Sequence, residues 1–236
     1  MFQLDYQENG LLTGQLFLKE SRWISHITAK PVTISIFSAY AKDRQAVEDF
    51  IINVYAKAYG ASIGIHYPIL MSVRDEAGKI LAALGFRYAA QEPLFLEQYL
   101  NQPVEKILKT PRDRITEIGN LASTGGGASV FLFAALSTYL HFKSQSHAVV
   151  TGTTFIEKRL GALGLKPKRL APADPSLLLH KNENWGTYYE TNPHVLSGDI
   201  SLGYKRLQKI LGAHYTDNRP RLIPRLHYRS DYHGSD

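Results

Sequence analysis

The sequence contains no cysteine among its 236 residues. Disulfide bonds, thiolate nucleophiles and cysteine-based metal sites are therefore excluded. Its nine histidines never occur in the His-x-x-x-His spacing of a helical metal site, so we expect no bound metal. The lack of cysteine fits a reducing compartment, and the expected localisation is cytoplasmic.

Long apolar segments are also scarce. The longest run covers 130–136 and extends loosely to residue 142, well short of the roughly 20 residues that a membrane-spanning helix needs. The opening MFQLDYQENG has no basic stretch followed by an apolar core, so no secretory signal peptide is expected. We therefore expect a soluble protein, and peripheral contact with a lipid surface stays open.

Positive charge is in excess, with a net charge of +6, and much of the excess lies late in the chain. Such a segment can be a solvated surface, or it can bind nucleic acid or anionic lipid. No nucleic-acid-binding motif accompanies it, so no nucleic-acid partner is expected. A basic rim would also suit an acidic carrier protein or a phosphorylated cofactor. The late basic residues are Lys205, Arg206, Lys209, Arg219, Arg221, Arg225 and Arg229.

Hydrophobic periodicity predicts one α/β (α+β) domain with a mixed sheet over residues 1–215, followed by a basic and possibly disordered tail over 216–236. Residues 1–30 are expected to be irregular, with one strand near 14–18. Further expected elements are a strand over 32–38, a helix from residue 43 to 60, a hairpin over 67–88, short helices over 92–100 and 103–108, and a final strand and helix over 195–201 and 205–211.

The most informative stretch, 114–165, predicts strand, glycine-rich turn, apolar helix, strand and helix. Small residues at the strand-to-helix turn let backbone N–H groups approach a ligand, and the helix N-terminus adds partial positive charge. The turn therefore predicts a phosphate site, although such a turn can also be a loop with a simple helix cap. The candidate phosphate-binding residues are Thr124, Gly125, Gly126, Gly127, Ala128 and Ser129.

The order of helix, hairpin, strand, glycine turn and helix resembles the GNAT-type N-acyltransferase superfamily. That resemblance implies a mostly antiparallel sheet flanked by helices, with a cofactor pyrophosphate at the glycine turn. Two positions depart from the superfamily pattern. Ala122 stands where Arg or Gln is usual, and Leu160 stands where the general-acid Tyr is usual.

Four longer sequence segments resemble the thermostable hemolysin family: HYPILMSVRDEAGKILAALGFRYA, EPLFLEQYL, EIGNLAS and WGTYY. This family is thought to share the acyltransferase-like fold and to lie near the acyl-homoserine lactone synthases. Those synthases carry Glu-x-x-Arg before the glycine turn, where this chain has Glu117 and Asn120. The hemolysin name itself implies a membrane-damaging role.

Acyl transfer to an amine requires a base and donors for the oxyanion. Within the resemblance, Glu117 is the expected base or anchor for a substrate ammonium; its alternative is a structural carboxylate paired with Arg87 or Arg114. Asn120 is expected to hold a carbonyl or polar substrate group, or else to form a bulge. Glu117 and Asn120 are therefore the candidate catalytic residues.

Further candidates are less specific. Arg44 is expected to bind a substrate carboxylate or to be an ordinary surface residue, and His66 could act as a base or be inert. Trp185 and Tyr188 are expected to line an acyl pocket or to belong to the core.

The resulting hypothesis is an N-acyltransferase that moves a long-chain acyl group from acyl-CoA or an acyl carrier protein to a small amine or amino acid. The alternative is a membrane-active, hemolysin-like protein without catalysis.

Overall fold

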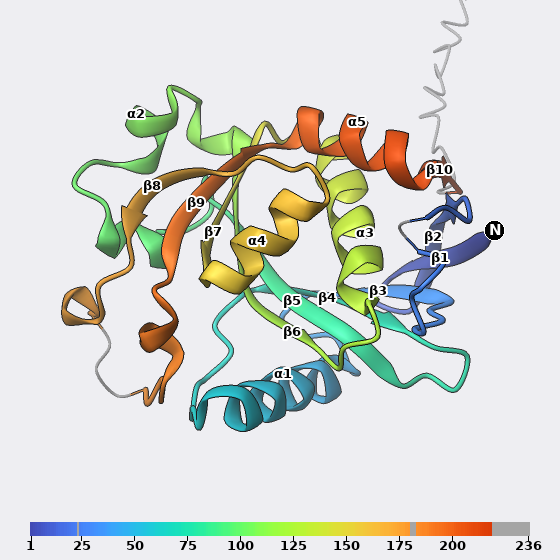
Figure 1. Cartoon of the computed structure of the whole chain (residues 1–236), viewed down its shortest axis with the longest axis horizontal. Coiled ribbons are helices and arrows are strands. Elements are labelled where there is room, and N and C mark those ends of the chain that lie inside the picture. Colours follow the sequence, from blue (N-terminus) through green and yellow to red (C-terminus); the bar gives the residue numbers. More distant parts are fainter. Residues whose placement is uncertain (23, 180–182, 219–236) are drawn as a thin grey trace, which may run out of the picture.

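The structure is a computed structural model of the chain and describes residues 1–22, 24–179 and 183–218. Strands and helices alternate along most of this part (Figure 1). The strands are β1 (Phe2–Glu8), β2 (Leu11–Leu18), β3 (Thr33–Phe37), β4 (Ile69–Arg74), β5 (Ile80–Tyr88), β6 (Ile115–Ser123), β7 (His147–Gly152), β8 (Lys168–Pro172), β9 (His194–Asp199) and β10 (His214–Asp217). The helices are α1 (Arg44–Tyr59), α2 (Val104–Leu108), α3 (Ala128–Phe142), α4 (Thr154–Ala162) and α5 (Ile200–Leu211), with short 3-10 helices η1 (Phe95–Tyr99), η2 (Arg112–Arg114), η3 (Pro175–Leu177) and η4 (Tyr188–Thr191).

The described strands form one sheet in the order β10-β2-β1-β3-β4-β5-β6-β7-β9-β8. Among these neighbours, β1/β3 and β6/β7 are parallel, and the other described pairs are antiparallel. The expected mixed, mostly antiparallel sheet flanked by helices is confirmed.

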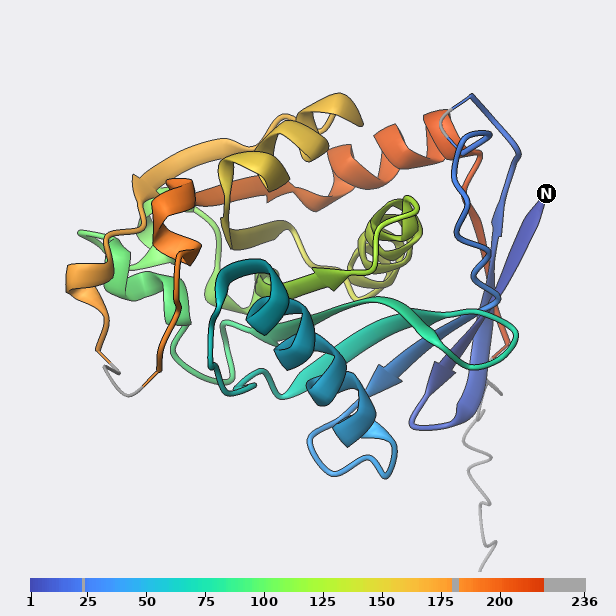
Figure 2. The same cartoon turned by 60° about the horizontal axis from the view of Figure 1, so that its bottom comes forward.

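Helices cover both faces of the sheet. Helix α1 contacts β4, β5 and β6, whereas α3 contacts β4 and β5 and carries α5 on its outer side. Figure 2 shows α1 on the opposite side of the sheet from α3 and α5. Because successive strand residues point to opposite faces, Leu84 and Phe86 of β5 join the cluster under α3, while Ala83 joins the cluster under α1.

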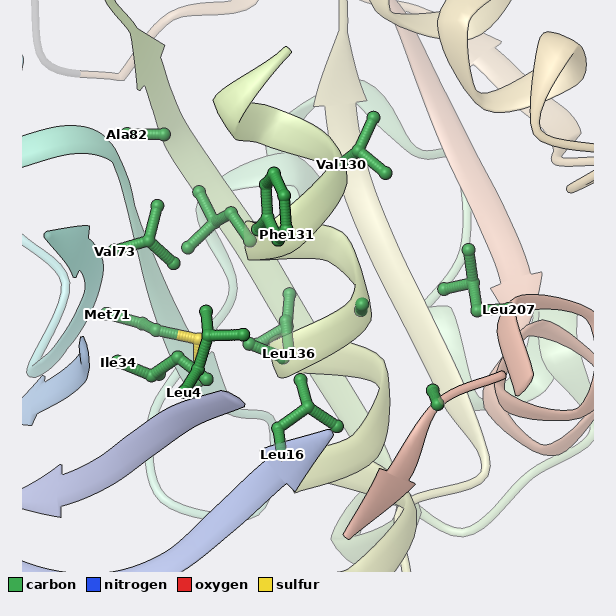
Figure 3. Packing of buried hydrophobic residues seen from close by; sticks show 14 of the residues in the cluster. Leu4, Leu16, Ile34, Met71, Val73, Ala82, Val130, Phe131, Leu136 and Leu207 are labelled. Carbon is green, nitrogen blue, oxygen red and sulfur yellow. The ribbon is translucent and has the colours of Figure 1, made fainter. Parts of the chain in front are cut away.

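Helix α3 is the centre of the larger core, as its apolar sequence predicts. Phe131 and Leu136 of α3 belong to this core. The same cluster contains Met71 from the sheet and Leu207 from α5 (Figure 3). Fully burying one such side chain contributes roughly 1.5–3 kcal/mol. This packing holds α3 in place, and it also holds the glycine turn that precedes the helix.

The first 18 residues are more regular than expected. The expected strand near 14–18 is confirmed as part of β2, but the prediction of an otherwise irregular start was wrong, because β1 and β2 pair as an antiparallel hairpin. Asn9 and Gly10 connect them with φ angles of 50° and 84°, the left-handed pair that a two-residue hairpin turn requires.

The C-terminal elements also differ from expectation in their bounds. The strand over 195–201 ends at Asp199, whose carboxylate accepts the backbone N–H of Leu202 and caps α5. The last helix therefore starts at Ile200, before the expected 205. Strand β10 then pairs with β2 as far as Asp217, and most of the expected basic tail, 219–236, lies outside the described residues.

Within the described ranges, no helix combines the length and apolar character that crossing a membrane requires.

Candidate active site

The parallel strands β6 and β7 separate part-way along their length. Their pairing runs from Ile115 opposite His147 to Ile118 opposite Val150, although β6 continues to Ser123. A cavity of about 560 Å³ borders this separation. Its lining includes Tyr55 of α1 on one face as well as residues of α3, α4 and α5 on the other. The cavity therefore passes through the sheet between the two strands.

The part of the cavity beside α3, α4 and α5 is mostly apolar. Three cations also border it: Lys166, Lys168 and Arg206. An apolar space edged by cations suits a hydrocarbon chain attached to an anionic group. The apolar lining residues from these elements and the loop after α4 are Phe133, Leu136, Leu140, Ile156, Leu160, Leu165, Pro167, Ile200, Leu202 and Leu207.

Asn120 lies at a bulge beside the strand separation. Gly119 pairs with Gly85, whereas Ala122 pairs with Ala83, so the ladder slips between these pairs. Asn120 has a φ of 50°, a conformation that asparagine adopts more readily than most residues. It borders the large cavity and also a smaller one on the α1 side. The side chain is thus placed for either expected role, as part of a bulge or beside a substrate.

Tyr67, which the sequence did not single out, packs across the bulge. A side chain at Gly85 or Gly119 would collide with its ring. The guanidinium of Arg87 stacks over the same ring, 4.5 Å from the centroid. One feature of the sequence could have indicated this packing. Each of the two apolar strands contains a glycine, and a glycine inside a strand often marks a place where another group approaches the backbone closely.

Glu117 is almost completely buried, with 1% of its surface exposed. Its carboxylate accepts backbone N–H groups of Phe95 and Leu96 at 2.9 Å and lies 3.3 Å from Nε of Arg87. Burial raises the pKa of Glu117 to about 7, opposed by the Arg87 charge and the two hydrogen bonds. These contacts match the structural alternative, and Glu117 lines neither cavity.

This raised pKa makes folding stability depend on pH through Glu117. The folded chain binds the proton more tightly than the unfolded chain, so the contribution is full at low pH and is lost as the pH rises to about 7. We expect the free energy of unfolding of wild type, relative to Glu117→Gln, to fall by up to roughly 3 kcal/mol between pH 4.5 and 8. Urea denaturation across this range measures it.

A matched change at the exposed turn residue Glu76 controls for the loss of one carboxyl group. A difference between wild type and Glu117→Gln that stays constant with pH would contradict the assignment.

The glycine turn packs against the segment before β3. Carbonyl oxygen of Gly126 accepts the N–H groups of Thr28 and Ala29 at 3.1 Å. A Cβ at Gly127 would collide with Ile27, and one at Gly126 would crowd Thr28. These two glycines are therefore required by packing as well as by their positive φ angles.

The rest of the turn remains open to a ligand. Thr124, Gly125 and Gly126 are exposed, and a Cβ at Gly125 would meet nothing within 4 Å. Within the described ranges, no hydrogen bond engages the N–H groups of Gly126, Gly127 or Ser129. These groups can donate hydrogen bonds to an anion at the start of α3. None of the residues 124–129 lines the large cavity.

Arg44 is buried rather than an ordinary surface residue. It pairs with Glu48 at 2.6 Å and donates to the carbonyl groups of Tyr67 and Pro68. Arg44 thus ties α1 to the chain before β4. It is not among the residues that line the two cavities.

Trp185 and Tyr188 pack against α1 beside the strand separation. Their ring centroids lie 5.4 Å apart, and Tyr188 stacks on Tyr55 at 6.1 Å. The Tyr188 hydroxyl donates to the carbonyl of Thr151 at 3.2 Å. Tyr188 borders both cavities and Trp185 borders the smaller one. The structure therefore brings these two aromatics together with Asn120.

Comparison with known families identifies the chain. The sequence profile described as "Thermostable hemolysin" matches residues 38–204. The chain belongs to the thermostable hemolysin family. A search of curated protein sequences gives no match.

Solved structures share the fold of this hemolysin family member at low sequence identity. TofI, in a ternary complex with an inhibitor and MTA, has a TM-score of 0.54 at 13% identity, covering 74% of this chain and 96% of TofI. BjaI, a CoA-dependent acyl-homoserine lactone synthase with SAM and isopentyl-CoA, has a TM-score of 0.53 at 12% identity, covering 75% and 87%. FeeM, an N-acyl amino acid synthase from uncultured soil microbes, has a TM-score of 0.50 at 11% identity, covering 73% and 98%. The expected acyltransferase-like fold is confirmed.

Proposed function

We propose that this protein is an N-acyltransferase that moves an acyl group, preferably a long chain, from an acyl thioester to a small amine or amino acid. The observation that carries the proposal is the apolar cavity that passes through the sheet between β6 and β7. A chain in this cavity is removed from water, while its thioester end can lie beside the polar groups of Asn120 and Thr151.

The donor is proposed to be acyl-CoA or the acyl-phosphopantetheine of a carrier protein. Its phosphates would meet the exposed part of the glycine turn at the N-terminus of α3. Lys166, Lys168 and Arg206 supply further positive charge at the cavity. The turn residues proposed to contact the phosphates or to shape their site are Thr124, Gly125, Gly126, Gly127, Ala128 and Ser129.

In the reaction, the amine nitrogen attacks the thioester carbonyl, a C–N bond forms, and the C–S bond breaks to release the thiol. Asn120 is proposed to hold the thioester carbonyl or a polar group of the acceptor. Glu117 and Arg44 are proposed as positioning residues, because Glu117 anchors Arg87 and η1, and Arg44 anchors the chain at Tyr67. Trp185 and Tyr188 are proposed to line the acceptor side.

The comparisons support acylation as the type of reaction. BjaI and FeeM are named as an acyl-homoserine lactone synthase and an N-acyl amino acid synthase. The alternative, a membrane-active protein without catalysis, is what the family name suggests, but the structural likenesses do not favour it. The two functions differ in whether lysis requires an acyl donor and an amine.

Donor binding and product formation test the proposal. At a concentration 100 times the dissociation constant, acyl-CoA should stabilise the fold by about 2.7 kcal/mol, which raises the melting temperature by roughly 5–10 °C in a chain of this size. The shift should grow with acyl chain length. Mass spectrometry of reactions with a panel of amines, with acyl-CoA and acyl carrier protein as separate donors, should then reveal an acylated amine.

Liposomes without donor or amine provide the control for direct lysis. Lysis by the purified protein alone, with no shift and no product for either donor, would establish the alternative instead.

A further inference from the structure

A second, smaller cavity of about 40 Å³ adjoins the strand separation on the α1 side. It shares Tyr55, Asn120, Thr151 and Tyr188 with the large cavity. The two cavities therefore meet at the place where the proposed reaction puts the thioester. If the donor occupies the large cavity, the small one is the remaining approach for the acceptor.

His66 and Glu183 stand together at this smaller cavity, although 117 residues separate them in the chain. Nε2 of His66 lies 2.8 Å from Oε1 of Glu183. An ionised carboxylate only accepts hydrogen bonds, so in the neutral form of the imidazole Nε2 carries the proton and Nδ1 presents its lone pair. No partner for Nδ1 occurs among the described residues. This is the arrangement in which a carboxylate orients a histidine base.

The surrounding backbone is shaped to hold this pair. A Cβ at Gly64 would lie 2.9 Å from Nε2 of His66 and 3.2 Å from Oε1 of Glu183. The N–H of Gly64 also donates to that carboxylate oxygen at 2.9 Å. Next to Glu183, Asn184 exchanges two backbone hydrogen bonds with Ser62, at 2.6 and 3.1 Å. Both partners are thus fixed by contacts between distant segments.

The charges at the cavity favour a cationic acceptor. Arg87 borders the cavity, but it lies 3.3 Å from Glu117 and 3.7 Å from Glu92, so its charge is compensated. The Glu183 carboxylate is then the charge at this cavity that faces the acceptor.

The aromatic lining favours an ammonium group further, because a cation is attracted to the face of an aromatic ring. The rings that border the cavity are Tyr55, Tyr67, Phe95, Trp185, Tyr188 and Tyr189.

Three buried polar atoms of residues that line this cavity have no hydrogen-bond partner among the described residues: Nε of Arg87, which lies 3.3 Å from the Glu117 carboxylate, Nε1 of Trp185 and Oγ1 of Thr151. An unpaired buried donor costs about 1–3 kcal/mol. A ligand oxygen that accepts from the indole N–H would remove this cost. The acceptor therefore fits best if it carries such an oxygen near its ammonium group.

We propose that His66, oriented by Glu183, is the general base of the acyl transfer, and that the acceptor is a primary amine bound as a cation, with a neutral oxygen rather than a carboxylate beside it. This inference rests on the proposed function. Nδ1 of His66 takes one proton from the ammonium and passes it to solvent, since 72% of the His66 side chain is exposed. The free amine attacks the thioester carbonyl, and its second proton goes to the leaving sulfur.

The test compares His66→Ala and Glu183→Gln with wild type, using acyl-CoA as donor and matched amino alcohols and amino acids as acceptors. Removing a general base lowers kcat by about 10²–10⁴-fold, while the thermal shift with acyl-CoA should be unchanged. Added imidazole should restore part of the rate of His66→Ala but not of Glu183→Gln, because only the first variant leaves space for it.

Gly64→Ala provides a second, milder disturbance of the pair, with Gly161→Ala as its control, because a Cβ at Gly161 meets nothing within 4 Å. Only Gly64→Ala should lower kcat.

The outcomes separate the two proposals. Acylated product from a His66→Ala enzyme at the wild-type rate overturns the base while the acyltransferase stands. Preference for amino acids over amino alcohols overturns the cationic acceptor. Absence of both donor binding and product in wild type overturns the proposed function and this inference together.

Discussion

Thr124→Asp is expected to weaken acyl-CoA binding at least tenfold at low ionic strength, whereas Thr124→Asn is expected to change it little. Thr124 is exposed at the start of the glycine turn, beside the N-terminus of α3. A carboxylate there repels the donor phosphates, and a tenfold loss requires only about 1.4 kcal/mol, within the range of two charges several ångströms apart near a protein surface. Isothermal titration calorimetry measures the dissociation constants.

The melting temperatures of the Asp and Asn variants show whether weaker binding comes from repulsion of the ligand or from misfolding. An acidic residue near a helix N-terminus stabilises the helix by about 0.3–1 kcal/mol, so the Asp variant should melt no lower than the Asn variant. High salt should reduce the difference in affinity, because the Debye length falls to about 3 Å at 1 M. Equal affinities for the two variants would place the phosphates elsewhere.

Ser137→Phe is expected to lower kcat/KM for a long-chain donor about 100-fold and to leave a four-carbon donor nearly unchanged. Ser137 lies on α3 and borders the large cavity. A phenyl ring there would displace three or four methylene groups of the chain, each worth about 0.8 kcal/mol when buried. Initial rates with a series of acyl-CoA chain lengths measure the effect.

The control for this variant is a neighbouring position that borders the same cavity. A Cβ at Gly203 of α5 would be 3.6 Å from Leu165 and 3.8 Å from Ser137, so Gly203→Ala is accommodated without a clash. It should raise stability by roughly 0.5–1 kcal/mol and preserve the chain-length profile. If Ser137→Phe lowered the rates for short and long donors equally, the acyl chain would not occupy this cavity.

Local patterns predicted much of the fold. Tyr59-Gly60 marked the end of α1, where Gly60 has a φ of 65°, and the turn at Gly78 marked the β4/β5 hairpin. The N-terminal hairpin was missed although Asn9-Gly10 is a strong turn signal and residues 2–7 alternate between apolar and polar; only the second strand, 11–18, departs from that alternation. The order of the ten described strands depends on long-range pairing that no local pattern specifies.

The candidate site, like the fold, could be predicted from the sequence only in part. Asn120 was predicted from a short motif on one strand, and the structure places it beside a cavity. Glu117 came from the same motif, but sequence offered either Arg87 or Arg114 as its partner, and only the β5/β6 register pairs it with Arg87. The pairing of His66 with Glu183 required two loops to meet beyond the C-terminal end of α1, for which the sequence carries no signal.

Different parts of the chain line the large and the smaller cavity on the two faces of the sheet. Residues of α3, α4 and α5 surround one side, whereas α1 and the segment around Trp185 surround the other. In the proposed reaction, mutations that change the acyl chain fall on one set of elements, and mutations that change the amine fall on the other. Under the proposed function, the two specificities can therefore diverge independently, so that one scaffold can yield different products without changes to its core.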